Sequence, residues 1–372
     1  MLTRIYIDNF RCFVNFEYRP ERKQLLLGPN GSGKSSLLDA INCLKQFVKG
    51  DENPFTSPTR TRWLDRPLQV FEMEAILEKQ KYEYRVAIRF ARSSASRDIA
   101  SSKLSISQEQ LKVSGKTVFE LAKGQIHFFQ NSSSQATTVP LETTRSALHL
   151  AQLSNLHVFR FVEWMNSVNC FRIDVYPEAM EESADREESE PRADLQNLAG
   201  WYRYLVQADP EANVRFLNSI KEVLPGFQTL RFSSDEDGKR RLRADFAGPR
   251  KGNMNFAISE LSDGQRCLLP LYMFLHFLIA RGNTVFIDEP DNYVALREIQ
   301  PWLLAAEAAV EDHNGQLILI SHHPEILNQW ASRHGLHFLR EENGQVRTKK
   351  FRFDPDGNLQ PSELIARGWE NE

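Results

Sequence analysis

The pattern of apolar and polar positions predicts two kinds of β-strand in this chain. Residues 24–27, 284–287 and 316–320 are nearly continuous apolar runs, which is the pattern of strands buried on both faces of a parallel sheet. Residues 68–77 and 82–90 instead alternate apolar with polar positions, and the short turn between them predicts an antiparallel hairpin. The chain is therefore predicted to be an α/β protein with an antiparallel β subdomain.

Further elements are predicted on both sides of this hairpin. Strands are expected at 2–10, 13–18, 104–113, 117–121, 229–232 and 242–246, and helices at 147–168, 193–206, 212–224 and 267–280. Residues 178–194 carry many acids and almost no apolar residue after Met180, which predicts a mobile, solvated loop.

Residues 28–35, Gly-Pro-Asn-Gly-Ser-Gly-Lys-Ser, form a complete G-x-x-x-x-G-K-S phosphate loop. The loop follows the predicted strand 24–27 and precedes a helical pattern at 36–41, which is the context that this motif requires. Backbone N–H groups of such a loop and of the following helix face a bound phosphate. The sequence therefore predicts a nucleoside triphosphate site, and a chance glycine-rich turn is the weaker alternative.

The residues of this loop have predicted roles. Lys34 is expected to be exposed and to reach the β- and γ-phosphates, and the Ser35 hydroxyl is expected to bind Mg²⁺. The other predicted nucleotide contacts are Asn30, Gly31, Ser32, Gly33 and Ser36.

Two of the apolar strands end in residues suited to triphosphate hydrolysis. Strand 284–287 is followed by Asp288, predicted to hold Mg²⁺ through water, and by Glu289, predicted to orient or deprotonate the attacking water. Strand 316–320 leads to His322 and His323, and a neutral imidazole there can bind a γ-phosphate. The spacing favours His322 and leaves His323 as the alternative. The non-catalytic alternatives are an ordinary acidic turn after strand 284–287 and ordinary surface histidines after strand 316–320.

The segment Glu260–Arg266, Glu-Leu-Ser-Asp-Gly-Gln-Arg, precedes the predicted helix 267–280. Together with the phosphate loop, the Asp-Glu-Pro strand and the strand ending in Ser-His, it resembles the motif set of ABC-type ATPases. The segment Ile7–Phe13, Ile-Asp-Asn-Phe-Arg-Cys-Phe, is similar to the RecF/SMC/OLD branch of that family. D-E-P-D-N, S-H-H-P and the C-terminal S-E-L-x-A-R-G-W at Ser362–Trp369 are similar to bacterial predicted AAA-family ATPases.

The resemblance implies an ATPase that binds ATP and Mg²⁺ and closes as a homodimer, or a higher oligomer, over two nucleotides. Ser262, Gly264 and Gln265 of one subunit then cover the γ-phosphate held by the other subunit, at a helix N-terminus that favours an anion. Asp263, where many members carry glycine, has to point away from the phosphate. The segment Asn292–Leu296 also departs from the family pattern.

Two further residues are assigned through the same resemblance. Arg11, just after the first strand, is expected to approach the nucleotide. Gln130, at the end of Ile126–Phe129, is the expected glutamine that serves the metal and the water, although an ordinary loop residue is an equal alternative.

The change of pattern along the chain predicts three parts. Residues 1–131 are expected to form an ATP-binding lobe with the β subdomain, and 132–258 an inserted helical and α+β region with the acidic loop. Residues 259–372 carry the signature and the strands ending in Asp-Glu and Ser-His. Coiled-coil heptads are absent from the sequence, which argues against a complete SMC arm protein.

Composition is that of an ordinary globular protein of 372 residues, with 41% hydrophobic and 26% charged residues. The four cysteines show no metal-ligand spacing, and the sequence opens directly into a predicted strand. The longest apolar stretch, 267–280, is too short to span a bilayer. A cytoplasmic protein without membrane association is expected.

The net charge of −3 restricts any nucleic-acid contact to a local patch. Two basic clusters are candidates, although a solvated face is the favoured reading of each taken alone. They are Arg231, Lys239, Arg240, Arg241, Arg243, Arg250 and Lys251, and Arg85, Arg89, Arg92, Arg97 and Lys103.

The predicted function is an ATP-dependent switch in DNA repair or in defence against foreign DNA. It is expected to gate a partner such as a nuclease, because the sequence shows no nuclease constellation outside the ATP site. The alternative is a regulatory protein whose ATP state controls a protein partner without nucleic acid. A transporter ATPase ranks last.

Overall fold

The computed structural model describes residues 1–50, 54–90, 104–129, 136–140, 143–173, 180, 182–234, 240–248, 252–353 and 359–368. The chain forms two compact units. The first unit contains residues 1–22, 26–169 and 336–351, and the second contains 23–25, 170–335 and 352–372. Each unit therefore combines segments that are far apart in the sequence.

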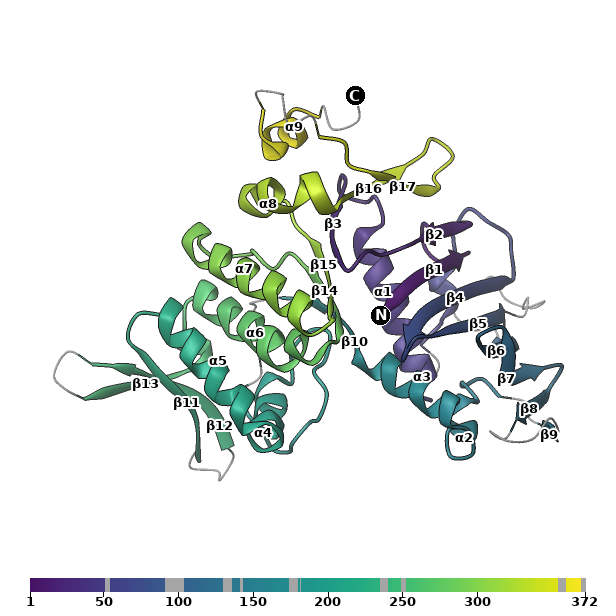
Figure 1. Cartoon of the computed structure of the whole chain (residues 1–372), viewed down its shortest axis with the longest axis horizontal. Coiled ribbons are helices and arrows are strands. Elements are labelled where there is room, and N and C mark those ends of the chain that lie inside the picture. The colour runs from purple at the N-terminus through teal and green to yellow at the C-terminus, as the bar shows by residue number, and fades with distance from the viewer. Residues whose placement is uncertain are drawn as a thin grey trace. The chain divides into compact units, whose positions relative to one another are not determined.

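An eight-stranded antiparallel sheet dominates the first unit (Figure 1). Its order is β2-β1-β4-β5-β6-β7-β8-β9. The bounds are β1 Leu2–Asp8, β2 Phe16–Tyr18, β4 Leu68–Leu77, β5 Gln80–Phe90, β6 Leu104–Val113, β7 Lys116–Ala122, β8 Gln125–Phe129 and β9 Ala136–Pro140. This unit also contains helices α1 Lys34–Val48, α2 Leu148–Ala151 and α3 Leu156–Ser167, and strands β16 Gly335–Arg340 and β17 Val346–Lys350, which follow β3 (Lys23–Leu27) in strand order.

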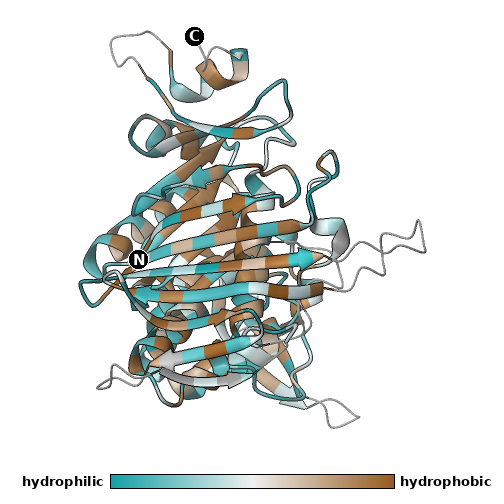
Figure 2. Cartoon of the chain, turned by 90° about the vertical axis from the view of Figure 1, so that its right-hand side faces the viewer, coloured by the Kyte–Doolittle hydropathy of each residue, from teal (hydrophilic) through white to brown (hydrophobic). Residues whose placement is uncertain are grey.

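Alternation of side chains explains why this sheet forms. Polar and apolar residues take turns along its strands, as the teal and brown bands of Figure 2 show. On the apolar face, the ring of Phe71 in β4 packs against Phe55, which in turn contacts Phe47 of α1. Tyr84 of β5 packs against Phe161 of α3, with ring centroids 5.1 Å apart. The helices α1 and α3 thus cover the apolar face.

The second unit is built on a sheet in which β14 and β15 pair in parallel, and on helices that pack along it. Strands β10 Val168–Arg172, β14 Thr284–Asp288 and β15 Gln316–Ile320 are followed by β3 in the order β10-β14-β15-β3. The helices are α4 Leu198–Ala208, α5 Pro210–Val223, α6 Asp263–Phe277, α7 Leu296–Asp312, α8 Pro324–His334 and α9 Pro361–Arg367. A separate antiparallel sheet contains β11 Phe227–Ser234, β12 Arg240–Ala247 and β13 Asn253–Ala257.

The register of β14 and β15 aligns the ends of the two strands. They pair in parallel from Thr284 opposite Gln316 to Asp288 opposite Ile320, and every residue of both strands is buried. Because their carboxyl ends coincide, the residues after each strand emerge at one edge of the sheet. In Figure 1, α6 and α7 lie side by side along these strands, where the Trp302 indole N–H donates to the Leu271 carbonyl at 2.8 Å.

The segment 147–168, predicted as one helix, is in fact two helices and the beginning of a strand. The Asn155 side chain accepts hydrogen bonds from the N–H groups of His157 and Val158 and thereby starts α3 anew. The prediction was wrong because it weighed apolar content and missed this N-cap. It also missed strand β10, which follows α3 directly.

The acidic segment 178–194 is not a mobile, solvated loop in its described part. The Ala184 N–H donates to the Arg240 carbonyl and the Glu182 carbonyl accepts from Leu242, so the segment pairs with β12. Arg241 forms a salt bridge with Glu182 at 3.0 Å. The acids are therefore held by backbone hydrogen bonds and by arginines, which composition alone could not show.

The stability of the fold is expected to depend on pH through His276 of helix α6. Burial, with repulsion from Arg215, lowers the pKa of His276 from 6.5 to about 4. As pH falls from 6.5 towards 4, the unfolded chain takes up this proton and the folded chain does not, so folding stability is lost over that window. We expect His276→Gln to remove about 1 kcal/mol of the stability difference between pH 7 and pH 5, allowing for the partial exposure of the ring.

Urea unfolding at the two pH values measures this effect. The exposed His313 provides the control, because His313→Gln should leave the difference between pH 7 and pH 5 unchanged. An equal pH dependence in wild type and His276→Gln would show that other groups cause it.

Candidate nucleotide-binding site

The phosphate loop of the first unit requires its glycines. Gly28 has φ of +133°, and a Cβ there would overlap the carbonyl oxygen of Phe338. Gly33 has φ of +107° and lies against Cys12 and Phe13. Gly31, also in the left-handed region, faces open space. A side chain in place of Gly28 or Gly33 would therefore clash with its neighbours and strain the backbone of the loop after β3. At Gly31, in the middle of the loop, there is free space.

The start of α1 is suited to an anion. Its N-cap is Gly33, which offers no side chain to the N–H groups of the first turn, and no acidic residue lies in that turn. The Ser32 side chain is buried, and its hydroxyl finds no hydrogen-bond partner within the described part of the chain. Ser35 and Ser36, in the first turn of α1, are each partly exposed, and Asn30 is exposed.

Lys34 differs from the expectation of an exposed side chain. It is only 7% exposed, and its ammonium donates to the carbonyl oxygens of Gly28 at 2.6 Å and Pro29 at 3.2 Å. The reason is local, because the loop curls over the start of α1 and turns these carbonyls towards the lysine. Lys34 therefore holds the loop in its curved form and keeps a positive charge inside it.

Arg11 lies in the first unit, where it pairs with Asp39 of α1. Its neighbour Asn9 is fully buried and donates to the carbonyls of Arg66 and Leu68, at 2.9 and 2.8 Å. The turn after β1 is therefore fixed by Asn9, whereas the half-exposed Arg11 is tied to the phosphate-loop helix.

The second unit presents the acidic pair at the end of β14. Asp288 is 4% exposed, whereas Glu289 is exposed and takes a left-handed backbone conformation with φ of 54°. The Glu289 N–H donates to the Ile320 carbonyl at 2.8 Å, and one of its carboxylate oxygens accepts from the Asn292 amide at 2.8 Å. This backbone turn separates a buried carboxylate from an exposed one within two residues.

Asp291 is a further carboxylate at this edge that the sequence reading did not single out. One of its oxygens, Oδ1, is buried without a hydrogen-bond partner among the described residues. Burial raises the pKa of Asp291, the charge of Glu289 adds to the rise, and a hydrogen bond to Ser321 opposes it. A buried oxygen without a hydrogen-bond donor lowers the stability of the fold unless a ligand or a water molecule donates to it.

The two histidines after β15 have different roles. His323 is the N-cap of α8, where its Nδ1 accepts from the Glu325 N–H at 3.2 Å, and its own N–H donates to Ser321 at 2.9 Å. His322 is exposed and does not cap the helix. The imidazole of His323 is therefore engaged as the N-cap of α8.

The signature residues form the N-terminus of α6, which starts at Asp263 rather than at Cys267. Ser262 caps the helix by accepting from the Gln265 N–H, and the Gln265 side chain accepts from the Ser262 N–H at 3.0 Å. Asp263 pairs with Arg266 at 2.6 Å. The Asp263 carboxylate is thus held by Arg266 of its own helix.

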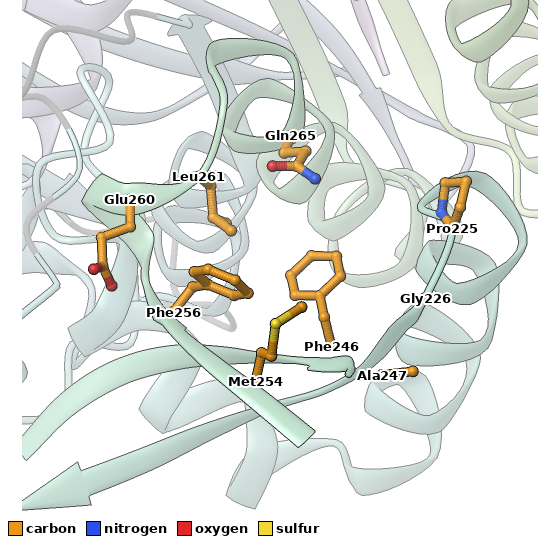
Figure 3. A pocket seen from close by; sticks show the side chains of 9 residues that line it. All are labelled: Pro225, Gly226, Phe246, Ala247, Met254, Phe256, Glu260, Leu261 and Gln265. Atoms are coloured by element: carbon orange, nitrogen blue, oxygen red, sulfur yellow. The ribbon is translucent and has the colours of Figure 1, made fainter. Parts of the chain in front are cut away.

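A small cavity with both polar and apolar walls lies beside this signature. Figure 3 shows Gln265 and Leu261 above the side chains of Phe246, Met254 and Phe256. The cavity has a volume of about 260 Å³. It lies between the start of α6 and the sheet that contains β11, β12 and β13.

The backbone at Gly264 is packed too closely against a neighbouring segment to accept a side chain. A Cβ at this position would lie 2.8 Å from the carbonyl oxygen of Tyr293, in the segment that departs from the family pattern. We expect Gly264→Ala to destabilise the protein by about 1–3 kcal/mol, because two backbone segments have to move apart. Thermal unfolding measures the loss. Gly252→Ala is the matched control, since a Cβ there meets open space, and equal melting temperatures of the two variants would contradict the close approach.

Arg172 is a second site residue that sequence reasoning missed. It is the last residue of β10, and its Nη2 lies 3.0 Å from Oδ2 of Asp288. The two residues are 116 positions apart, so only the strand order could have shown the pair.

Some predicted residues lie outside the described part of the chain. They are Gln130, Lys239, Arg250 and Lys251, and Arg92, Arg97 and Lys103 of the other basic cluster. Among the described residues, no group of three or more histidine, cysteine, aspartate or glutamate side chains is placed to hold a metal ion. No helix in the described ranges is both long enough and apolar enough for a membrane span.

Comparison with known families gives two matches. The family described as "AAA domain, putative AbiEii toxin, Type IV TA system" matches residues 25–328, and the "P-loop containing region of AAA domain" matches residues 2–45. The first match covers the phosphate loop, the signature, the acidic pair and the histidines. No curated protein matches the chain.

Solved structures of SMC head domains are similar in fold. One is an SMC head bound to the C-winged helix domain of ScpA, with a TM-score of 0.57, 11% identity, and coverage of 94% of this chain and 97% of that one. Another is a Pyrococcus furiosus SMC head with an extended coiled coil bound to the C-terminal domain of ScpA. It has a TM-score of 0.55, 11% identity, and coverage of 100% and 99%. The predicted fold class, a P-loop NTPase with an ABC-type ATPase head and a β subdomain, is confirmed.

Proposed function

The chain belongs to the AAA-domain family that matches residues 25–328, and from that premise we propose that it is an ATP-driven switch of the RecF/SMC/OLD-like group. In this proposal the protein binds ATP with Mg²⁺, closes as a dimer over two nucleotides, and hydrolyses them slowly. It works in the cytoplasm and gates an effector protein.

The observation that carries this proposal is the phosphate loop in front of α1. The glycine backbone, the uncapped helix N-terminus and the buried ammonium of Lys34 all favour one ligand, a polyphosphate. The orphaned hydroxyl of Ser32 fits the same ligand, because a phosphate oxygen can accept its hydrogen bond.

The residues present also fit Mg²⁺. This ion prefers hydroxyl, carboxylate and phosphate oxygens and is usually held by one or two protein oxygens together with phosphate. Ser35 offers a hydroxyl at the start of α1, and Asp288 offers a carboxylate at the end of β14. When bound, the ion would neutralise the charge of the phosphates.

The remaining residues act on water and on the terminal phosphate. Glu289 is exposed and held by Asn292, which suits a base that accepts a proton from the attacking water. His322 would donate a hydrogen bond to the γ-phosphate. Ser262 and Gly264, at the N-terminus of α6, would cover the phosphate of the opposite subunit.

We place this switch in DNA repair or in defence against foreign DNA, with DNA contacted by the antiparallel sheet β11-β12-β13. Arg231 and Arg243 lie directly opposite each other in the register, and Arg241 lies on the same face. Asp245 pairs with Arg231 at 2.8 Å, and Asn255 accepts from Arg243 at 3.2 Å. Like charges opposite each other on a sheet are destabilising, and Asn255 brings no negative charge to Arg243, so a polyanion would relieve the charge of Arg243 on this face.

Duplex DNA binding at several salt concentrations tests this assignment. Arg231→Gln with Arg243→Gln should weaken binding and reduce the salt slope by about 2, since each lost phosphate contact accounts for about 0.9. Arg281→Gln with Arg297→Gln is the control of equal charge change and should behave as wild type. If Arg231→Gln with Arg243→Gln binds duplex DNA with unchanged affinity, DNA does not contact this face.

The second candidate is an ATP-dependent regulator of a protein partner, and four exposed apolar side chains in one segment of the first unit favour it. Leu150, Leu153, Leu156 and Phe159 lie on or between α2 and α3, and Leu153 is 93% exposed. Exposed apolar side chains that gather on a surface mark protein contacts. A wild-type protein that fails to bind DNA but co-purifies with a partner, and loses it on Leu153→Lys, would support this candidate.

A further inference from the structure

Arg172 lies on the carboxylate that the proposed function assigns to a metal ion. Its guanidinium Nη2 is 3.0 Å from Oδ2 of Asp288. The side chain of Asp288 is 5% exposed, whereas that of Arg172 is 63% exposed. The acid is therefore buried, and its arginine partner reaches it from the solvent side.

The different exposure of the two partners decides what can move. A buried carboxylate without a cation is strongly disfavoured, so Asp288 needs a positive charge beside it at all times. Arg172 is always protonated, but most of its side chain is already hydrated, and turning away from Asp288 requires little further change in its solvation. Arg172 is thus the partner that can be exchanged.

A divalent cation at Asp288 would compete with this arginine. The two positive groups would use the same buried carboxylate, and they would repel each other at short range in a poorly solvated place. Asp288 is expected to hold Mg²⁺ through water, and a water ligand of the ion would then compete with the guanidinium as the donor to the same buried oxygen.

We propose that Arg172 is the resident counter-ion of Asp288 and that a divalent cation has to displace it. Arg172 thereby sets the Mg²⁺ concentration at which the nucleotide site fills. This inference rests on the proposed function in one respect, namely that Asp288 serves the metal ion.

The alternative is a salt bridge with a purely structural role. In that case, removal of Arg172 lowers stability but leaves the Mg²⁺ dependence of ligand binding unchanged. The two readings therefore differ in a binding measurement, independently of any ATPase assay.

The experiment measures binding of adenylyl-imidodiphosphate, an ATP analogue that is not hydrolysed, over a range of Mg²⁺ concentrations. We expect the half-saturating Mg²⁺ concentration to fall about three- to tenfold in Arg172→Ala and Arg172→Gln, because a competing cation of a partly exposed pair is gone. Arg172→Lys keeps the charge and should remain near wild type. Arg281→Ala breaks a comparable pair with Asp209, at 2.7 Å, and serves as the matched control.

A second measurement uses Mg²⁺ alone and follows thermal unfolding. Arg172→Gln should be stabilised at lower Mg²⁺ concentrations than wild type, since its Asp288 lacks the arginine. Equal Mg²⁺ dependence of wild type and Arg172→Gln in both measurements overturns the inference. If wild type binds no analogue at any Mg²⁺ concentration, the proposed function fails, and the Mg²⁺-only titration still decides the role of Arg172.

Discussion

Lys34→Ala is expected to lower ATP affinity by about 100-fold, because it removes a charged donor to the phosphates from a place where water cannot replace it. The structure sharpens this expectation. The ammonium is held inside the loop by the carbonyls of Gly28 and Pro29, so it is already in place before a phosphate arrives. Binding then exchanges these neutral acceptors for charged ones, which are the stronger partners.

The same contacts call for a second variant. Lys34→Ala also removes the support of the two carbonyls, so a loss of binding could follow from a distorted loop. Lys34→Met keeps most of the buried stem and removes only the charge and the hydrogen bonds. Titration calorimetry with ATP, together with circular dichroism to check the fold, should show the loss in both. A folded Lys34→Met protein with wild-type affinity would contradict the assignment of the loop.

The elements around the motifs could be predicted because their patterns are local. Residues 68–77 form β4 with the predicted bounds, since alternation over ten positions leaves little choice of register. The strands before Gly28, Asp288 and Ser321 could be read from short apolar runs, because the motifs beside them exclude a helix. The choice of His322 over His323 rests on spacing, and the structure shows that His323 is the N-cap of α8.

Features that depend on distant partners could not be predicted in this way. Strand β10 has five residues, too few for a periodic signal, and it directly follows a helix. Arg172 reaches Asp288 only because β10 lies beside β14 in the sheet, which the sequence does not show. The burial of Lys34 depends on two backbone carbonyls. The acidic segment is ordered by β12, through residues that lie 56 and 60 positions further along the chain.

One motif acquires a structural explanation. The C-terminal S-E-L-x-A-R-G pattern coincides with α9, where the Gln360 N–H donates to the Glu363 side chain at 3.0 Å and Gly368 ends the helix with φ of 73°. The Ser362 N–H donates to the Asn328 side chain of α8 at 3.1 Å. Glutamate and glycine at these positions start and stop a short helix, so the pattern itself needs no role in catalysis.

Glu289→Gln is expected to reduce ATP hydrolysis by about 100- to 10,000-fold while leaving ATP binding nearly unchanged. The glutamine keeps the length of the side chain, and its oxygen can still accept from the Asn292 amide. It cannot take a proton from water, so the ATP-bound state persists. If the subunits close over ATP, this variant should accumulate as a dimer when ATP and Mg²⁺ are present, which sedimentation velocity detects.

A second substitution tests whether the signature of one subunit meets the nucleotide of the other. Ser262→Arg, added to Glu289→Gln, should disperse the dimer, because a bulky side chain then stands at the N-terminus of α6. Ser262 also caps that helix, and loss of the cap alone costs about 1 kcal/mol. Ser262→Ala in the same background loses the cap without adding bulk and should still form dimers. Absence of any ATP-dependent association in Glu289→Gln would contradict the sandwich, since an ATP-bound state that cannot turn over is the one in which closure has to be most stable.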